Sequence, residues 1–218
     1  MKAPNRGRLK FAIMWANHEW VNIHPANFTN RPETLTRPVT PSQFDAICDH
    51  IVSNYFTQPN YWCIDGKPYF SIYEVGQFVQ NMGGWDAAVA KLDLLRSKTR
   101  AAGFPGLHLN AVVWGLKILP KELKIGEPAD IVRRLGADSS TTYAWAHHYS
   151  PGANGFPRDS YARAAAANYE TWDHYRKSLP VPYHPNVSMG WDPSPRCTQS
   201  DSYANRGYPW TAILDGNT

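Results

Sequence analysis

The sequence predicts an α/β protein with a parallel sheet, of the (β/α)8 TIM-type barrel class. Three observations support this fold class. Segments typical of strands alternate along the chain with segments typical of helices. The connecting helices are long enough for right-handed crossovers between parallel strands. Polar and aromatic residues follow the carboxyl end of each strand, and in a barrel these ends meet at one mouth.

The first strand and the first helix are predicted within the first quarter of the chain. The strand spans Leu9–Trp15 and is followed by a loop rich in Pro and Asn. The helix begins with Thr40 as N-cap and Pro41 at its first position, where proline is favoured. Its apolar residues recur at steps of three and four, as in an amphipathic helix: Phe44, Ile47, Cys48, Ile51, Val52 and Tyr55.

A turn, a strand and a long helix come next. Asp65–Gly66 forms the turn, and Tyr69–Tyr73 is the second strand. The stretch "WDAAVAKLDLLRSKTRAAG" predicts a helix that is closed by Gly103, because glycine readily adopts the left-handed conformation found at helix ends. The chain therefore keeps its strand–helix alternation.

The rest of the chain continues this alternation to its last strand. A strand over 106–114 is followed by a short helix over 127–136. A strand over 138–145, a long helix over 159–179 and a strand over 184–192 complete the series. The order is thus β-α-β-α-β-α-β-α-β.

Two architectures accept this order, an open doubly wound sheet and a (β/α)8 barrel. No glycine-rich phosphate fingerprint follows any strand, so the dinucleotide-binding form of the open sheet has no support. Five strands are too few for a complete barrel. We therefore expect residues 1–218 to form a single domain that is a segment of a longer barrel. About two strands would precede it and about one would follow, as barrel geometry requires.

Composition excludes several classes of function. Only 18% of residues are charged and the net charge is +4, with no block of like charge, which argues against a nucleic-acid partner. No apolar run is long enough to cross a membrane. The cysteines Cys48, Cys63 and Cys197 lack metal-ligand spacing and permit at most one disulfide. The localisation stays open, although a signal peptide preceding this segment would favour a secreted or periplasmic protein.

The aromatic content points towards sugar binding. The chain contains nine Trp, twelve Tyr and eight Phe. Tyr and Trp combine an apolar ring with a polar group and favour surfaces that contact ligands. A large aromatic core is the alternative. Amides and carboxylates at the strand ends favour a glycan or polysaccharide partner.

The chain resembles the WbsX-like family, described as lipopolysaccharide-biosynthesis glycosyltransferases and related to glycoside hydrolase family 99. The matching stretches are "FAIMWANHEW", "IDGKPYFSIY", "AAGFPGLHL", "LGADSSTTY" and "HPNVSMGWDPSPR". The resemblance implies a (β/α)8 barrel in which these stretches supply the third to seventh strands. It also implies carbohydrate-active chemistry, with related glycosidases cleaving α-mannosidic links through a carboxylate pair. No cofactor is implied.

The sequence departs from this family at three places. The family more often has an acid one position before Glu19. Family 99 enzymes have a second glutamate three residues after the first, whereas here that position is Asn22, which cannot act as an acid or base. The family's final Trp-Asn-Glu-Trp motif lies beyond the end of this chain. The second catalytic acid is therefore not identified.

Two glutamates are the candidate catalytic residues, because glycoside cleavage needs a proton donor and a nucleophile or base. Glu19 follows the first strand, between Trp15 and Trp20, which we expect to shield it from solvent; the alternative is a solvated loop residue. Glu74 follows the next strand in sequence and would be the proton donor, unless an acid outside this chain has that role. The alternative for Glu74 is a structural partner of Arg or Lys.

The remaining candidates are substrate-binding residues that follow the strands. His147 and His148 point to opposite sides of an extended chain, so a shared metal ion is not expected, and His108 completes no ligand motif. Asp192 is either a substrate contact or the cap of an Asp-Pro turn clamped by Arg196. The predicted set is Trp15, Asn17, His18, Trp20, Tyr73, Asn110, Trp145, His147, Trp191, Asp192 and Arg196.

The sequence therefore predicts a glycoside hydrolase acting on mannose-containing or similar glycans. One alternative is a glycosyltransferase of polysaccharide biosynthesis, although the chain has no DxD pair and no basic cluster for a diphosphate. A second alternative is a glycan-binding domain without catalytic activity, which Asn22 keeps open.

Overall fold

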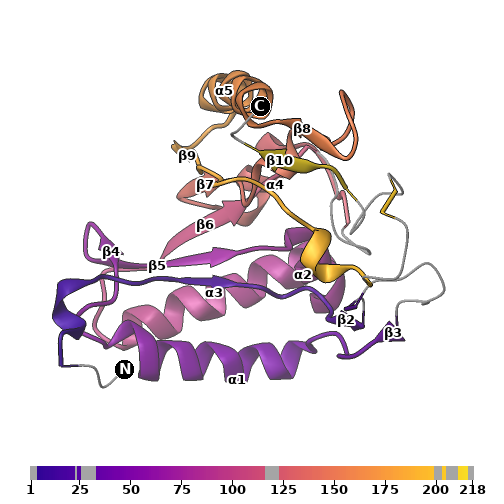
Figure 1. The fold of residues 1–218 in the computed structure, drawn as a ribbon. Coiled ribbons are helices and arrows are strands. Elements are labelled where there is room, and N and C mark those ends of the chain that lie inside the picture. The colour runs from indigo at the N-terminus through magenta and orange to yellow at the C-terminus, as the bar shows by residue number, and fades with distance from the viewer. Residues whose placement is uncertain are drawn as a thin grey trace.

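The computed structural model describes residues 4–22, 24–25, 33–115, 123–198, 203–204 and 211–215. Its centre is a sheet in which every neighbouring pair along the main path is parallel (Figure 1). This confirms the predicted parallel α/β architecture. The strands along this path, in sheet order, are β1 (Ile13–Trp15), β5 (Lys67–Ile72), β6 (His108–Val112), β7 (Ser139–Thr141) and β9 (Tyr183–His184).

Helices pack against one face of this sheet. They are α1 (Pro41–Ile51), α2 (Val75–Met82), α3 (Trp85–Ala101), α4 (Pro128–Leu135) and α5 (Tyr161–Ser178). One core cluster joins Phe44 of α1, Leu92 of α3 and Tyr175 of α5 with the strand residues Phe70 and Leu109. Residues from all three helices therefore contact the same core.

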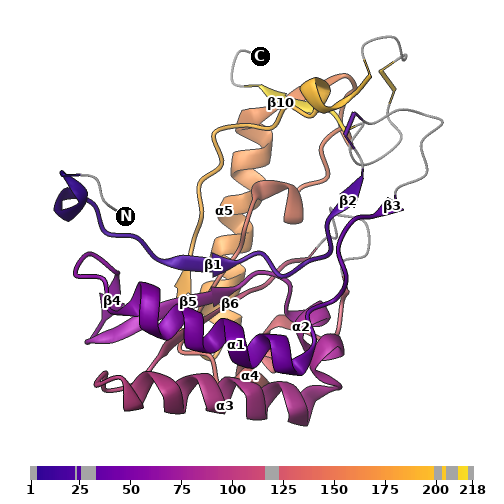
Figure 2. The same cartoon turned by 90° about the horizontal axis from the view of Figure 1, so that it is seen from below.

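The sheet is curved, with its helix-covered face on the outside (Figure 1 and Figure 2). In Figure 1, α1 and α3 lie below β1 and β5, whereas α5 lies above β7 and β9. Figure 2 shows the same arrangement from below, with α1 and α3 in front of the strands and α5 behind them. Since α1, α3 and α5 share one core, the strands must bend between them. Curvature of this kind is found in barrels, where helices surround the sheet.

Alternation along the strands separates the two faces of the sheet. Phe70 and Ile72 of β5 belong to the helix-facing core, as do Leu109 and Ala111 of β6. The residues between them point to the opposite face and include Ser71, which is fully buried. This opposite face is the one that would line the interior of a barrel.

The predicted start of α1 is confirmed by its cap. The Thr40 hydroxyl accepts a hydrogen bond from the Gln43 amide, and the Gln43 side chain accepts one from the Thr40 amide. Pro41 occupies the first turn, as expected. The helix continues into a π-helical turn over Val52–Phe56. The predicted helix is therefore correct, apart from the different geometry of its last turn.

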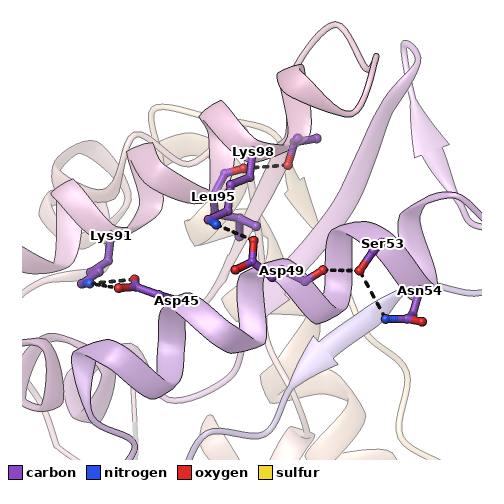
Figure 3. A network of polar contacts seen from close by, with 8 residues as sticks. Asp45, Asp49, Ser53, Asn54, Lys91, Leu95 and Lys98 are labelled. Atoms are coloured by element: carbon purple, nitrogen blue, oxygen red, sulfur yellow. Dashed lines mark hydrogen bonds and ion pairs between the residues drawn. The ribbon is translucent and has the colours of Figure 1, made fainter.

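The helices α3 and α4 agree with the predicted ranges. The chain leaves α4 through Gly136, whose φ of 59° is the left-handed conformation predicted for a glycine at a helix end. Gly103, two residues beyond α3, has a φ of 93°. In addition, α1 and α3 are joined across their surfaces by ion pairs of Asp45 with Lys91 and of Asp49 with Lys98 (Figure 3).

Three local predictions were wrong. The sequence reading missed α2, an eight-residue helix directly after β5. The strand predicted over 138–145 ends at Thr141, and Trp145–His147 forms a 3-10 turn. The strand predicted over 184–192 pairs in the main sheet only at its first residue, because β9 is Tyr183–His184.

Smaller elements lie at the edges of the structure. The strand β4 (Cys63–Ile64) forms a hairpin with β5 through the predicted turn at Asp65–Gly66. Two further strand pairs and two 3-10 turns were not predicted: β2 (Val21–Asn22) with β3 (Glu33–Thr34), β8 (Arg158–Ser160) with β10 (Ile213–Asp215), Arg6–Arg8 and Ser194–Arg196. The three cysteines are free thiols. Among the described residues, no helix has the length and apolar character needed to span a bilayer.

Candidate functional site

The carboxyl ends of β1 and β5 are joined by the side chain of Asn17. Its Nδ2 donates to the Glu74 carbonyl oxygen at 2.7 Å, and its Oδ1 accepts from the Glu74 amide at 2.8 Å. Asn17 is buried. Because both ends of its amide bind backbone, Asn17 positions the two strand ends next to each other.

Glu74 caps the first turn of α2. Its Oε1 accepts hydrogen bonds from the amides of Gly76 at 3.0 Å and Gln77 at 3.3 Å. These amides have no partner inside the helix, and the positive end of the helix dipole also stabilises a carboxylate at this position. Glu74 is fully buried. Glu74 follows a strand that is the direct neighbour of β1, as expected, and its described side-chain hydrogen bonds are those of a helix cap.

Glu19 lies over the same turn of α2. Its backbone amide donates to Oε1 of Gln77 at 3.1 Å, and its side chain is half-buried. Since β1 and β5 are direct neighbours, Glu19 and Glu74 follow adjacent strands, as the sequence predicted. The two tryptophans that flank Glu19 in the sequence have different surroundings. Trp15 stacks on Phe44 in the helix-facing core, and Trp20 is 58% exposed.

An aromatic cluster gathers where four strands end. We define it as His18, Tyr73, Trp114, Tyr143 and His147. The Tyr73 ring is its centre, with ring centroids at 5.6 Å from His18, 5.5 Å from Trp114 and 4.8 Å from Tyr143. The His147 ring stacks on Trp114 at 5.0 Å with an interplanar angle of 16°. The chain thus brings together rings that follow β1, β5, β6 and β7.

Exposure differs across the aromatic cluster. Tyr73 and His147 are buried, whereas Tyr143 is 52% exposed and Trp114 is half-buried. Trp20 extends the exposed side through its contact with His18, with ring centroids 5.4 Å apart. The cluster therefore has a buried floor and an exposed rim of aromatic faces.

His147 and His148 face different surroundings. His147 contacts Trp114 in the aromatic cluster, whereas His148 packs edge-on against Tyr175 of α5. Burial, with a smaller contribution from His147, lowers the pKa of His148 to about 4. His148 is therefore uncharged at neutral pH. Within the described ranges, no group of three His, Cys, Asp or Glu side chains could hold a metal ion.

Asn110 lies deeper in the structure, on the strand β6 itself. Its Oδ1 accepts from the Ser71 hydroxyl and its Nδ2 donates to Ser139 Oγ, both at 2.9 Å. Ser139 Oγ also lies 2.8 Å from Nε2 of His108. This buried row ties β5, β6 and β7 together, and Asn110 is fully buried within it. A substrate contact is therefore not proposed for Asn110.

Trp145 belongs to a second core. It is 2% exposed and packs with Tyr149, Ala164 and Leu214. Its Nε1 donates to the Asn186 carbonyl oxygen at 3.0 Å. Trp145 was predicted to bind substrate, but its ring has no exposed face and lies in this core. The strand prediction over 138–145 caused the error, because the chain turns after Thr141.

The last predicted group lies beyond β9, next to β10. Trp191 pairs with Leu214, and its Nε1 donates to Thr211 Oγ1 at 2.8 Å. Asp192 Oδ1 accepts from the amide and the hydroxyl of Ser194, which is the turn cap foreseen as the alternative. The Arg196 guanidinium lies 5.4 Å from the centre of the Trp191 ring.

Sequence reasoning missed two residues at the strand ends. Tyr143 was assigned to the interior of a strand, although its place two residues after Thr141 is a strand-end position. Gln77 holds the Glu19 backbone from α2, a helix that the sequence analysis did not include. The apolar run after Glu74, with a residue able to cap at its start, was the available signal.

Comparison with known proteins identifies the family. A family model described as "Glycosyltransferase WbsX" matches residues 2–207, which is nearly the whole chain. The chain belongs to the WbsX family. This confirms the resemblance predicted from the strand-end motifs. The comparison with curated proteins finds no match.

Two solved structures are similar to this WbsX family member. One is the GH99 endo-alpha-mannosidase from Bacteroides thetaiotaomicron, at 14% identity and a TM-score of 0.40, covering 75% of this chain and 40% of that one. The other is a "Glycoside hydrolase-like protein", at 18% identity and a TM-score of 0.47, covering 81% of this chain and 43% of that one. The chain thus spans less than half the length of either structure.

Proposed function

We propose that this chain is part of a carbohydrate-active enzyme that cleaves glycosidic bonds in mannose-containing or similar glycans. The observation that carries the proposal is the aromatic cluster beside Glu19 at the ends of four parallel strands. Sugar rings have apolar faces that pack on aromatic planes, and a carboxylate beside them can act on the glycosidic bond.

Glu19 is the proposed nucleophile or base. Its backbone amide is held by Gln77, and the residue is half-buried and directly follows His18 of the aromatic cluster in the chain. A group fixed in this way needs less reorganisation to reach the reacting atom than a mobile one. Glu74 is the second candidate, as proton donor, although its hydrogen bonds to α2 favour a positioning role. A proton donor outside this chain is the alternative.

The exposed aromatic rings are the proposed sugar platform. Trp20 and Tyr143 are the most exposed, with Trp114 between the rim and the buried floor. His18 and His147 supply ring nitrogens within the same cluster. We further propose that the curved sheet is part of a (β/α)8 barrel whose mouth this cluster occupies.

The description of the family favours sugar transfer as a second candidate. A transferase can also use a carboxylate base and aromatic contacts to the sugar, so the site alone accepts either reaction. Binding without catalysis is the third candidate, because Asn22 replaces a glutamate at the position that the family 99 resemblance makes catalytic. A hydrolase consumes a glycan, a transferase consumes a sugar donor, and a binding domain consumes neither.

The test compares Glu19→Gln with Glu74→Gln in the full-length protein. We expect Glu19→Gln to lower hydrolysis of α-mannosides by about a hundredfold or more, with glycan binding retained. A matched control is Asp93→Asn, exposed on α3 and outside the aromatic cluster. Thermal unfolding of Glu74→Gln separates a lost helix cap from lost chemistry, because only the former lowers stability.

Three results would contradict the proposal. Unchanged hydrolysis in Glu19→Gln would exclude this residue as the catalytic carboxylate. Consumption of a nucleotide sugar, with no hydrolysis of any glycan, would favour the transferase. Glycan binding by the unmodified protein, with neither reaction, would favour the binding domain.

A further inference from the structure

A hollow lies between the start of α4 and the middle of α5 and adjoins the aromatic cluster at Trp114. Its volume is about 600 Å³, within the range of small-molecule sites. It is lined by Trp114 after β6, His148 after β7, Glu127 before α4, and Glu170, Thr171 and Tyr175 on α5. Of the aromatic cluster only Trp114 takes part, and Glu19 and Glu74 do not line it.

The His148 imidazole is a polar group that lines this hollow. The ring is neutral at pH 7, so one nitrogen donates and the other accepts. Such a group suits a hydroxyl, which can do both.

The charges around the hollow disfavour an anionic ligand. Of the described residues that line it, Glu127 and Glu170 are carboxylates, His174 is an imidazole, and the Lys124 ammonium lies 3.3 Å from Oε1 of Glu127. One ammonium group against two carboxylates leaves a negative balance, which repels phosphate or a uronic acid. Carboxylates accept hydrogen bonds from hydroxyl groups without this penalty.

The apolar lining is aromatic. Trp114 and Tyr175 both line the hollow, and the His148 ring contacts Tyr175 with centroids 5.5 Å apart. Aromatic faces combined with a few polar groups are typical of sites for small ligands. A sugar unit matches this combination, since it has apolar C–H faces and a ring of hydroxyl groups.

We infer that this hollow binds a neutral, polyhydroxylated ligand of one or two sugar units, with hydroxyl groups bonded to His148 and Glu170. The site goes beyond the proposed function, because it uses neither Glu19 nor the exposed rim of the aromatic cluster. It would bind a free sugar, or one unit of a longer glycan held elsewhere on the protein.

The test follows the histidine resonances of the 15N-labelled full-length protein during titration with methyl α-mannoside or myo-inositol. We expect the His148 signals to shift in a saturable way. Thr171→Trp, which fills the hollow from α5, should weaken this binding by about tenfold or more. Lys177→Ala, exposed on the same helix, is the control and should leave it unchanged.

Two outcomes would overturn the inference. One is no saturable shift of His148 with either ligand, or the same affinity in Thr171→Trp as in the parent. The other is tighter binding of a nucleoside diphosphate sugar than of neutral sugars at this position. Failure here is distinguishable from failure of the proposed function, because the His148 titration is read in Glu19→Gln as well as in the parent. A mannoside oligomer compared with the monomer distinguishes a glycan unit from a free sugar.

Discussion

The side chains of Asn17 and Glu74 form hydrogen bonds with backbone groups at the point where a strand ends and a helix begins. The Asn17 amide bridges two strand ends, and the Glu74 carboxylate binds two amides of α2. Buried backbone groups at such junctions need partners, and short polar side chains supply them. The same residue types serve in catalysis. Their presence after a strand therefore predicts a polar junction, and the contacts decide which role each residue has.

His148 gives the protein a stability that depends on pH. Its pKa is lowered to about 4 in the folded state, mainly by burial, whereas a histidine in an unfolded chain titrates near 6.5. As the pH falls, the unfolded state takes up this proton first, so stability is complete above about pH 6.5 and decreases towards about pH 4. We expect a loss of about 2 kcal/mol between about pH 7.5 and about pH 5.

Urea unfolding of the parent and of His148→Phe at the two pH values checks this prediction. The variant should lose less stability on acidification, because its side chain does not titrate. His50→Gln, at an exposed histidine on α1, is the control and should behave like the parent. An equal acid-induced loss in His148→Phe and in the parent would contradict the prediction.

At the scale of elements, the long helices and the parallel strand order could be predicted, whereas α2 and the last strand could not. The helix α1 carries its own boundary signal in Thr40 and Pro41, and α4 ends at a glycine that needs a left-handed φ. The helix α2 is short and begins soon after β5, and the predicted strand Tyr69–Tyr73 ended before it without any helix being assigned there. The pairing of β9 depends on β7, which lies about forty residues earlier, and local sequence carries no such information.

The positions of the strand ends also determine which site residues could be predicted. Residues next to confidently placed strands, such as Tyr73 and His18, were found and do meet. Trp145 and Asp192 follow strands whose ends were misplaced, and they lie in a core and in a turn instead. Tyr143 was missed because the predicted strand continued past it, whereas β7 ends at Thr141 and Tyr143 follows the strand end. Errors of a few residues at a strand end thus decide which side chains reach the aromatic cluster.

The contact between α1 and α3 includes two ion pairs whose contribution can be measured. The Lys91 ammonium lies 2.6 Å and 2.7 Å from the two Asp45 oxygens, and Lys98 binds Asp49 one turn further along (Figure 3). These side chains are partly exposed to water, which screens the attraction. We expect Asp45→Asn to lower the free energy of unfolding by at most about 1 kcal/mol.

Denaturant unfolding of Asp45→Asn at low and high salt measures this contribution. The loss of stability should be smaller at high salt, because added salt weakens the Asp45–Lys91 attraction in the parent and leaves less to lose. The control is Asp173→Asn, which breaks an exposed ion pair with Arg176 within α5. It should lower the free energy of unfolding by less than Asp45→Asn does. A loss that does not depend on salt would show that packing of the Asp45 side chain, rather than its charge, holds the helices together.

At the scale of the whole molecule, the curvature of the sheet relates the local site to the proposed barrel. In the described sheet, β5, β6 and β7 each pair on both sides, whereas β1 and β9 have a main-sheet neighbour on one side. A closed barrel has no edge strands, so in the full-length protein β1 and β9 would each gain a second neighbour. Hydrogen exchange distinguishes the two cases, because an amide paired within a closed sheet opens only with larger units of structure.

We expect the backbone amides of β9 in the full-length protein to exchange within about tenfold of those of β6, a difference of at most about 1.4 kcal/mol in opening free energy. The amides of β2, in a two-stranded pair outside the main sheet, serve as the fast-exchanging control. If β9 exchanges as fast as β2 while β6 stays protected, the sheet is open at β9. The aromatic cluster would then lie at the rim of an open sheet, where solvent reaches it from the side, and the barrel mouth proposed for sugar binding would be wrong.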